Sequence, residues 1–404
     1  MRHLVLGLAL LVPVTAAADP VAPVTAETPD RALRDWAAAF RLRALAQGIR
    51  PETFDAAFRD LRPDAEALTR DRNQTEFVRT LWDYLDRAVS EKRITEGQAA
   101  LARHAGLLDR IEATYGVEKE ILVAVWGIET SYGANRGSHP LIPALATLAH
   151  DGRRAAFFEA QLIAALKILD RGDIAPDAMR GSWAGAMGHT QFMPTSYLAI
   201  AQDFDGDGRR DIWSDDPADA LASTAAYLAQ SGWRKGQPWG IEVRLPVHFD
   251  FAESGKTVRH GMARWQALGL RAADGGALPD HGEAALLLPG GAQGAAFLIF
   301  GNFRALARYN PADAYVVAVG HLADRLTGAG PILGDWPRGD RALLDAERHD
   351  LQRLLTAAGY DTQGVDGRIG PNTLAALRAW QKAQGLTPDG YANEAVLNRL
   401  RGGA

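Results

Sequence analysis

Apolar side chains recur every three or four positions along residues 30–170, and this spacing constrains the fold of the 404-residue chain more than any other feature. It matches the 3.6-residue turn of an α-helix, which gathers such side chains on one face that must be buried. Residues 217–231 and 302–327 continue the pattern, so the expected fold is mainly α. Stripes of this kind are Leu33, Trp36 and Phe40, and Leu81, Tyr84 and Leu85.

A smaller part of the chain has the pattern of β-strands. Residues 240–251 alternate apolar and polar side chains, which predicts a strand with one buried face. Residues 286–288 and 296–300 are short apolar runs on either side of a turn at 289–291. Together these segments predict a small β module within an α-rich domain, which is an α+β arrangement.

The composition changes near the C-terminal end of the chain. Residues 328–340 contain four Gly, two Pro and two Asp, and this predicts a linker at 331–340. Beyond it, residues 341–401 carry new helical stripes and form a compact unit that suits a small three-helix bundle. The larger domain is expected to span residues 30–330.

The N-terminus has the pattern of a cleavable secretory signal. Arg2 and His3 precede a short apolar run at 4–14, and an A-x-A exit follows, so residues 1–18 are predicted to be a signal peptide. Residues 19–29 are rich in Pro, Ala and Thr and are expected to be a disordered leader. A buried N-terminal helix is the weaker alternative, because the Pro-rich segment cannot continue it.

The overall composition excludes several kinds of partner and site. The net charge of −5 does not favour binding to nucleic acid or to anionic membranes. The chain has no cysteine, which excludes disulfides, thiolate metal sites, a cysteine nucleophile and a lipid anchor on an N-terminal cysteine.

Glu129 is the only acid in the apolar segment 121–133. Apolar surroundings disfavour the carboxylate and should raise its pKa. A carboxyl group that stays protonated near neutral pH is what glycosidic-bond cleavage requires of its general acid. A solvent-facing or salt-bridged glutamate fits the spacing about equally well, although the negative end of a helix dipole disfavours Glu at this position.

A second segment, residues 181–197, mixes glycines with amides, hydroxyls and aromatic side chains. Small residues allow a ligand to approach the backbone closely, and aromatic and polar side chains suit sugar rings. The composition alone fits an ordinary Gly-rich loop at least as well.

Taken together, these blocks resemble the lytic murein transglycosylase B family. The chain reads W-G-I-E-T-S-Y-G at 126–133, then G-S-W-A-G-A-M-G-H-T-Q-F-M-P-T-S-Y at 181–197, and N-F-x-x-x-x-x-Y-N at 302–310. The resemblance covers roughly residues 30–330. It implies a mainly α, lysozyme-like catalytic core with a helical lobe around a deep groove, beside the small β module.

By motif position, the resemblance implies that Glu129 is the single catalytic acid/base. The remaining implied positions contact the sugar or line the cleft, and they are Ser182, Gln191, Met193, Tyr227, Tyr309, Asn310, Tyr315 and Tyr84. His189 stands where the family commonly has an aromatic residue, which we expect to alter a subsite without touching the acid.

The same resemblance implies a reaction and a location. The enzyme would cleave the bond between N-acetylmuramic acid and N-acetylglucosamine in peptidoglycan and leave a 1,6-anhydromuramyl end, acting as a monomer in the periplasm. Two alternatives stay open: a lysozyme-type hydrolase and a non-catalytic cell-wall-binding protein.

The segment 203–219 resembles a calcium-binding EF-hand loop. Acids at Asp203, Asp205, Asp207 and Asp211 occupy loop positions 1, 3, 5 and 9, and the backbone carbonyl of Arg209 would occupy position 7. The twelfth position is a serine, so Asp216 or Asp219 would supply the missing carboxylate. The family pattern favours Asp219. We expect a structural Ca²⁺ here, because clustered carboxylates repel one another unless a cation neutralises them, although a metal-free Asx-rich turn is the alternative. No organic cofactor is expected.

The C-terminal unit is similar to the type 1 peptidoglycan-binding domain. The carrying block reads G-V-D-G-R-I-G-P-N-T at 364–373, with a tight turn expected at Asp366 and Gly367 and a helix start at Pro371. The resemblance implies binding to peptidoglycan glycan strands, whereas a bundle with only a packing role is the alternative.

Overall fold

The computed structural model describes residues 29–72 and 79–402. The predicted signal peptide at 1–18, and all of the predicted leader except its last residue, lie outside the described residues. The helices are α1 (Pro29–Ala46), α2 (Pro51–Ala57), α3 (Ala65–Arg72), α4 (Leu81–Ala88), α5 (Glu91–Arg103), α6 (Ala105–Tyr115), α7 (Lys119–Thr130), α8 (Leu141–Asp151), α9 (Ala155–Arg171), α10 (Pro194–Ile200), α11 (Ala218–Gln230), α12 (Met262–Ala267), α13 (Gly301–Tyr309), α14 (Asp313–Leu326), α15 (Asp345–Ala357), α16 (Pro371–Ala383) and α17 (Glu394–Gly402).

The strands are β1 (His139–Pro140), β2 (Arg180–Gly181), β3 (Gly240–Arg244), β4 (Arg259–His260), β5 (Arg271–Ala272), β6 (Ala284–Leu287) and β7 (Ala296–Ile299). Short 3₁₀ turns occur at Pro176–Ala178, Phe251–Glu253 and Gly291–Gln293. The mainly α prediction is therefore confirmed.

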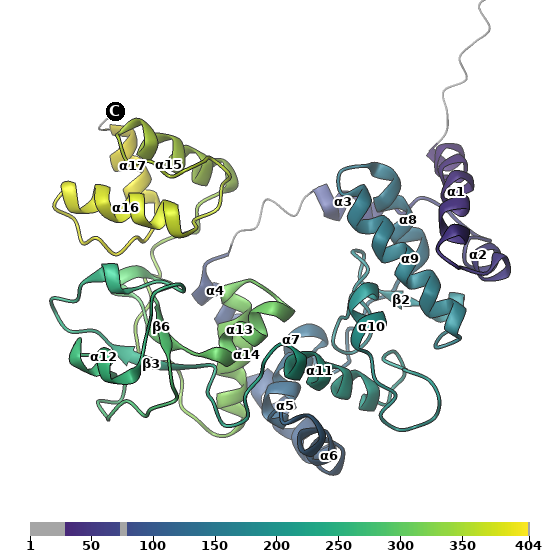
Figure 1. Cartoon of the computed structure of the whole chain (residues 1–404), viewed down its shortest axis with the longest axis horizontal. Helices are drawn as coiled ribbons and strands as arrows, with labels where there is room; N and C mark the ends of the chain where they lie inside the picture. The colour runs from purple at the N-terminus through teal and green to yellow at the C-terminus, as the bar shows by residue number, and fades with distance from the viewer. Residues whose placement is uncertain (1–28, 73–78, 403–404) are drawn as a thin grey trace, which may run out of the picture.

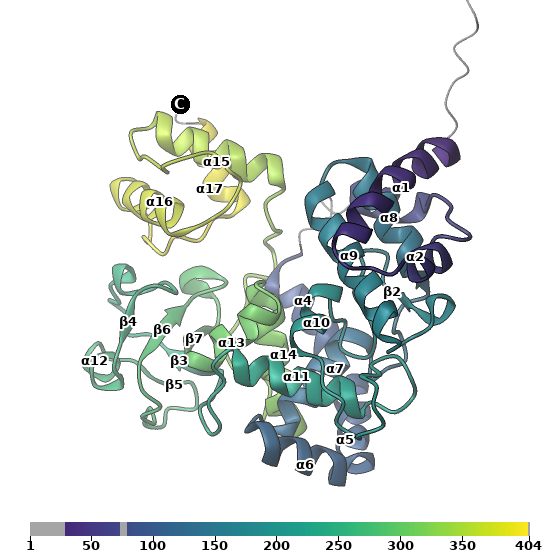
Figure 2. The ribbon, with the colours of Figure 1, turned by 45° about the vertical axis from the view of Figure 1, so that its right-hand side comes forward.

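The helices of the main domain enclose two hydrophobic cores. Helices α1, α2, α3, α8, α9 and α10 form a lobe around one core, which includes Phe40, Phe158 and Tyr197. Helices α4, α5, α6, α7, α11, α13 and α14 surround the other. The two groups lie side by side in the views of Figures 1 and 2. Tyr227 and Tyr309 pack against both cores, so they mark the seam between them.

The β module is a five-stranded antiparallel sheet in the order β4-β6-β7-β3-β5. Side chains on one face, such as Phe297, join the core that contains α14, whereas Leu286 and Leu298 on the other face pack with Trp265 of α12. The strand predicted at 240–251 ends early at Arg244. Pro246 follows, and proline cannot donate a ladder hydrogen bond.

The helical segment predicted at 302–327 consists of two helices. α13 ends at Tyr309 and α14 begins at Asp313. Pro311 lies between them, and because it lacks an N–H and restricts the preceding residue, it breaks the helix. The break matters for the site, because it lets α13 and α14 present Tyr309 and Tyr315 to the same region.

The predicted linker at 331–340 has no helix or strand, but it is fixed against the β module. The Glu242 carboxylate accepts hydrogen bonds from the backbone N–H groups of Leu333 and Gly334. Arg338 forms an ion pair with Asp86 of α4 at 2.7 Å. Trp336 packs against aromatic rings of α4 and β7. The segment is therefore a docked connection and not a free tether.

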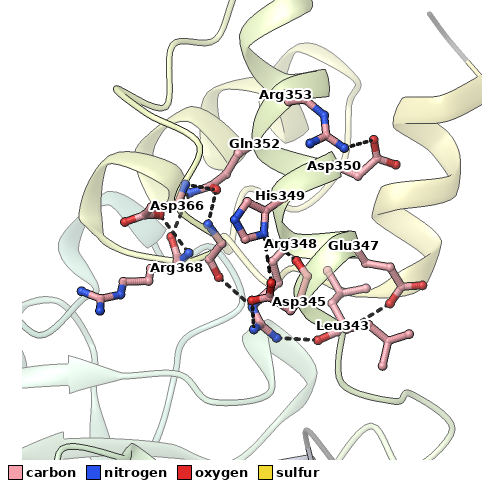
Figure 3. A network of polar contacts seen from close by, with 12 residues as sticks. Leu343, Asp345, Glu347, Arg348, His349, Asp350, Gln352, Arg353, Asp366 and Arg368 are labelled. Carbon is pink, nitrogen blue, oxygen red and sulfur yellow. Dashed lines mark hydrogen bonds and ion pairs between the residues drawn. The ribbon is translucent and has the colours of Figure 1, made fainter. Parts of the chain in front are cut away.

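The C-terminal unit is the predicted bundle of three helices, α15, α16 and α17, around its own core. Its centre is the buried Gln352, shown in Figure 3, whose amide nitrogen donates to the Asp366 carboxylate and the Arg368 carbonyl, both at 3.0 Å. The amide oxygen accepts from the N–H groups of Asp366 and Gly367. These bonds confirm the tight turn, in which Gly367 takes the positive φ of 71° that glycine allows.

Gly320 on α14 offers a test of how tightly the β module packs on the central helices. A Cβ added there would lie 2.4 Å from the buried Trp239 ring. We expect Gly320→Ala to lower the free energy of unfolding by about 1–3 kcal/mol through overpacking. The matched control is Gly106→Ala in α6, where no atom lies within 4 Å, and this change should stabilise by about 0.5–1 kcal/mol. Chemical denaturation measures both, and equal shifts would contradict the packing argument.

Candidate active site

Helix α7 places Glu129 at its C-terminal end. Seven consecutive residues, from Ile121 to Gly127, are buried, so the helix runs through the core and only its last turn reaches the seam. The helix ends because Ser131 and Tyr132 take left-handed φ angles of 51° and 58°. The turn is held by hydrogen bonds from the N–H groups of these two residues back to carbonyls of α7.

The Tyr132 ring folds back beneath this turn. Its hydroxyl donates to the Arg93 carbonyl at 2.6 Å. A Cβ at Gly127 would lie 2.6 Å from the Tyr132 ring, so only glycine leaves room for it. Gly127 and Tyr132, which lie on either side of Glu129 in the W-G-I-E-T-S-Y-G block, therefore have packing roles. Their contact sets the direction of the end of α7.

Glu129 is partly buried and is held by one side chain. The Tyr315 hydroxyl donates to Glu129 Oε1 at 2.7 Å. Burial raises the pKa of Glu129 to about 7, and the hydrogen bond from Tyr315 opposes this rise only in part. In the described residues Glu129 forms no ion pair, so no cation holds it ionised. At neutral pH both its protonated and its ionised forms are substantially populated.

Three tyrosines gather at the acid. The rings of Tyr309 and Tyr315 are parallel within 4°, with centroids 6.5 Å apart. Burial raises the pKa of both, and the neighbouring Glu129 charge raises them further. Tyr84 of α4 responds to burial and to Glu129 in the same way. These phenols therefore stay protonated and can act as hydrogen-bond donors.

Tyr227 and Asn310 lie next to this group. The Tyr227 ring packs edge-on against Tyr309 with centroids 5.1 Å apart, and its hydroxyl donates to the Arg308 carbonyl at 2.7 Å. The Asn310 side chain accepts from the Ala312 N–H and so supports the break between α13 and α14. Four helices, α4, α11, α13 and α14, and the connection between α13 and α14 therefore supply this group of side chains. Its members are Tyr84, Tyr227, Tyr309, Asn310 and Tyr315.

The segment 181–193 forms a compact loop below the end of α7. The Ser182 Oγ accepts from the Ala186 N–H at 3.0 Å, which closes a tight turn. Gln191 has a positive φ of 56°, and its amide donates to the carbonyls of Arg136 and Gly188. Met193 precedes α10. The loop contacts the tyrosine group through the Thr190 carbonyl, which accepts from the Tyr309 hydroxyl.

The structure places His189 inside the domain, so any effect on a subsite would be indirect. Its side chain is only 3% exposed and lies beneath the end of α7, where burial lowers its pKa. The reason is local: its ring is hydrogen-bonded to Trp126 Nε1 and to the Ser214 carbonyl. Sequence reasoning missed Trp126, Thr130 and Arg136 as its partners. The only signal was the departure from an aromatic residue at this position.

The acidic loop brings three of its predicted ligands together. Carboxylate oxygens of Asp203, Asp205 and Asp207 lie within 4.8 Å of one another, and the three residues are exposed. Each also accepts a hydrogen bond from a loop N–H, and these bonds hold the carboxylates within the loop. Three converging hard oxygen donors fit a calcium ion.

Asp219 is not one of these three converging carboxylates, but it lies beside Asp205, whose charge acts on its pKa. It is buried at the start of α11, and its two oxygens accept from the N–H groups of Phe204 and Asp211 at 2.7 and 2.8 Å. Burial raises the pKa of Asp219 to about 6. Asp219 therefore closes the loop in the structure, and its role as a ligand stays a prediction, as does that of the Arg209 carbonyl.

Two known domains match the chain. A transglycosylase SLT domain matches residues 32–324, and a putative peptidoglycan binding domain matches residues 345–400. Membrane-bound lytic murein transglycosylase B of Escherichia coli K12 is 33% identical over 241 residues, which are 59% of this chain and 65% of that protein. The alignment thus spans slightly less than two thirds of that curated relative.

Solved structures extend the comparison. SltB3 of Pseudomonas aeruginosa, in complex with NAG-anhNAM-pentapeptide, has a TM-score of 0.89 and 50% identity, with 91% of this chain and 99% of that chain covered. Slt35 of Escherichia coli, in complex with calcium, has a TM-score of 0.62 and 27% identity, with 74% and 93% covered.

These matches confirm the predicted lysozyme-like core with a small β module and the C-terminal peptidoglycan-binding domain. Because the first match covers most of the chain, this protein belongs to the transglycosylase SLT domain family.

Proposed function

We propose that the protein is a lytic transglycosylase that cleaves the β-1,4 bond between N-acetylmuramic acid and N-acetylglucosamine in peptidoglycan. The observation that carries this proposal is Glu129, a partly buried carboxyl group whose pKa is raised to about 7 and which forms no ion pair in the described residues. Membership of the transglycosylase SLT domain family and the relative bound to an anhydro-sugar fragment support it.

The proposed mechanism uses one carboxyl group twice. Protonated Glu129 donates its proton to the glycosidic oxygen while the bond from that oxygen to C1 of the muramyl unit breaks. The positive charge at C1 is held as an oxocarbenium-like state or by the 2-acetamido group. The ionised Glu129 then takes the proton of the muramyl C6 hydroxyl as its oxygen bonds to C1. The 1,6-anhydro ring closes, Glu129 is protonated again, and no water is consumed.

The side chains around Glu129 have separate roles in this mechanism. The Tyr315 hydroxyl stabilises the ionised Glu129 between the two steps. Tyr84 stays protonated and can donate to sugar, whereas the Tyr309 hydroxyl is committed to the Thr190 carbonyl and its ring presents an aromatic face. We propose that Ser182, Gln191, Met193, Tyr227 and Asn310 bind the glycan on the flanks.

Mass analysis of products tests the reaction. Digestion of purified peptidoglycan should release fragments that end in 1,6-anhydromuramic acid, which is 18 mass units lighter than the reducing end because no water is added. Reducing ends alone would show a lysozyme-type hydrolase, which keeps Glu129 as the acid but uses water as the nucleophile. If no soluble fragments were released, the remaining alternative would be a non-catalytic cell-wall-binding protein.

We also propose that Ca²⁺ binds at Asp203, Asp205 and Asp207, with the Arg209 carbonyl and Asp219 completing the site. The convergence of three carboxylates supports this, as does the relative solved with calcium. The ion would neutralise the mutual repulsion of the acids and fix the loop that packs against segment 181–193. Its role is structural, since the triad contributes no atom to the proposed chemistry.

Adding Ca²⁺ should stabilise the fold. Ion binding to the folded state alone contributes about 2.7 kcal/mol at a hundredfold excess over Kd, so Tm should rise by several degrees over a chelator-treated sample. Asp207→Asn should remove most of this gain, because the substitution keeps the hydrogen bond to the Arg209 N–H but removes a charge. Exposed Asp177→Asn is the control that keeps the full gain. An equal gain in both variants would contradict the site.

The partner and place of action follow from the chemistry. The C-terminal unit belongs to a domain family described as peptidoglycan-binding, and we propose that it holds glycan strands near the active site. We propose that the protein acts as a monomer in the periplasm after its signal peptide is removed. Within residues 29–72 and 79–402, no helix has both the length and the apolarity needed to cross a membrane.

A further inference from the structure

His189 uses all four of its polar groups to join two parts of the main domain. Its backbone N–H and carbonyl and its two ring nitrogens each have a hydrogen-bond partner. Two of the partners belong to α7 and two belong to residues 212–214, in the part of the acidic loop that follows the three carboxylates. The residue is almost fully buried, so these bonds are shielded from water.

The two bonds to α7 hold the turn that carries Glu129. Trp126 Nε1 donates to His189 Nδ1 at 3.0 Å, and Thr130 Oγ1 donates to the His189 carbonyl at 2.6 Å. Trp126 and Thr130 are four residues apart and therefore lie on one face of the helix. Glu129 directly precedes Thr130. The pair thus fixes both the direction and the rotation of the last turn of α7.

The other two bonds join His189 to the backbone carbonyls of Ile212 and Ser214 in the acidic loop. The His189 N–H donates to the Ile212 carbonyl at 3.1 Å. Because Nδ1 accepts from the indole, Nε2 carries the proton of the neutral ring and donates to the Ser214 carbonyl at 2.7 Å. Arg136 supports this end by donating to the same carbonyl at 2.6 Å.

Residues 212–214 are tied to the part of the acidic loop that carries the triad of Asp203, Asp205 and Asp207. The Asp211 carboxylate accepts from the N–H groups of Trp213 and Ser214, and the Asp211 N–H donates to Asp219. Asp219 also holds Phe204, which lies between two acids of the triad. A chain of hydrogen bonds therefore runs from the triad to the end of α7, and the His189 ring is the link that an aromatic residue could not provide.

We propose that His189 is a positioning residue that ties Glu129 and its helix to the acidic loop, so that a cation bound at Asp203, Asp205 and Asp207 restrains the catalytic acid. This rests on the proposed function, both for the acid and for the ion. The experiments below report ion binding, transmission and catalysis separately.

The effect of ion binding on the end of α7 can be followed by NMR, through the indole N–H signal of Trp126. In ¹⁵N-labelled protein this signal is assigned by its loss in Trp126→Phe. Titration with CaCl₂ should shift it in the wild type, while calorimetry reports ion binding directly. In His189→Phe calcium should still bind, but the Trp126 signal should shift much less, because only the backbone bonds of residue 189 remain. A signal that fails to respond in the bound wild type, or that responds equally in His189→Phe, would overturn the proposal. Calorimetry without binding heat would overturn the calcium assignment and, with it, the coupling.

Turnover tests the positioning role. His189→Phe should lower kcat about tenfold with KM nearly unchanged, because misplacing a catalytic group slows the chemical step more than it weakens binding. Trp126→Phe should cause part of the same loss. The control is Trp239→Phe, which removes a comparable buried indole hydrogen bond, to Asp324 at 2.9 Å, far from the loop. A loss of kcat in the control equal to that in His189→Phe would show general destabilisation and overturn the assignment.

Discussion

Glu129→Gln should lower kcat for cleavage of purified peptidoglycan by about 10³-fold, within the range of a general acid–base group. The amide cannot donate a proton to the glycosidic oxygen or accept one from the C6 hydroxyl, so both steps lose their catalyst. Its carbonyl oxygen can still accept from the Tyr315 hydroxyl, so the fold and KM should change little. Release of soluble muropeptides over time measures the effect.

The matched control is Glu120→Gln, in the first turn of the same helix. It removes the same charge from α7 at the opposite end, and turnover should stay at the wild-type level. If Glu129→Gln released muropeptides as fast as the wild type, Glu129 would not be the catalyst and the proposed mechanism would fail.

The Glu129→Gln variant should also be more stable than the wild type at alkaline pH. The folded pKa of Glu129, about 7, lies above its ordinary value of 4.5, so the folded state favours the protonated form. The unfolded chain ionises first as the pH rises. The wild type therefore loses stability between about pH 4.5 and pH 7 relative to the glutamine variant, and the difference stays constant above that window. Tm measured at pH 4 and pH 8 checks the sign.

The helix that carries Glu129 could be predicted because its signal is local. The apolar run at 121–128 specifies a buried helix, and it makes a raised pKa one of two equal readings for the acid that follows it. The raised pKa expected from that run has the predicted direction. The tight turn at Asp366 and Gly367 could be predicted for the same reason, since glycine at a positive φ is a local requirement.

The partners of these residues could not be predicted from spacing. Tyr315 is 186 residues from Glu129, and nothing in its own helix distinguishes it from a core tyrosine. It was placed at the acid only through a family resemblance. The contacts of His189 could not be predicted for a related reason: they depend on Trp126 and Ser214, which are distant in sequence and carry no common pattern. Contacts that join separate segments are set by the packing of whole helices.

The docked connection at 331–340 shows how composition can mislead about tertiary structure. Gly and Pro predict the absence of helix and strand, which is correct, but they do not predict mobility. Gly334 is needed because a Cβ there would lie 2.8 Å from the Ala295 backbone, so this glycine permits close packing. The C-terminal unit is also held directly, through Arg378 to Ser254 and through Asp389 to Ala292. Binding by this unit would therefore present glycan at a set position relative to Glu129.

The dependence of activity on pH distinguishes one catalytic carboxyl group from two. If Glu129 alone is required, and in its protonated form, kcat/KM, which reports the free enzyme, should fall about tenfold per pH unit above its pKa of about 7. No acidic limb arises from Glu129, because the carboxylate needed in the second step is generated by the first. A second essential carboxylate would add an acidic limb and give a bell-shaped profile.

Tyr315→Phe shifts this profile in a direction that the structure fixes. Burial is the main reason for the raised pKa of Glu129, and the hydrogen bond from Tyr315 opposes it. Removing the hydroxyl leaves burial unopposed, so the pKa should rise and the alkaline limb should move to higher pH. The activity of the variant relative to the wild type should therefore increase with pH, even though its kcat is lower because the ionised acid is less stabilised. Tyr115→Phe, whose hydroxyl contacts Gln202 and not the acid, should leave the limb in place. A limb that moves to lower pH in Tyr315→Phe would mean that Tyr315 does not stabilise the carboxylate, and the proposed route of the proton through Glu129 alone would lose its structural basis.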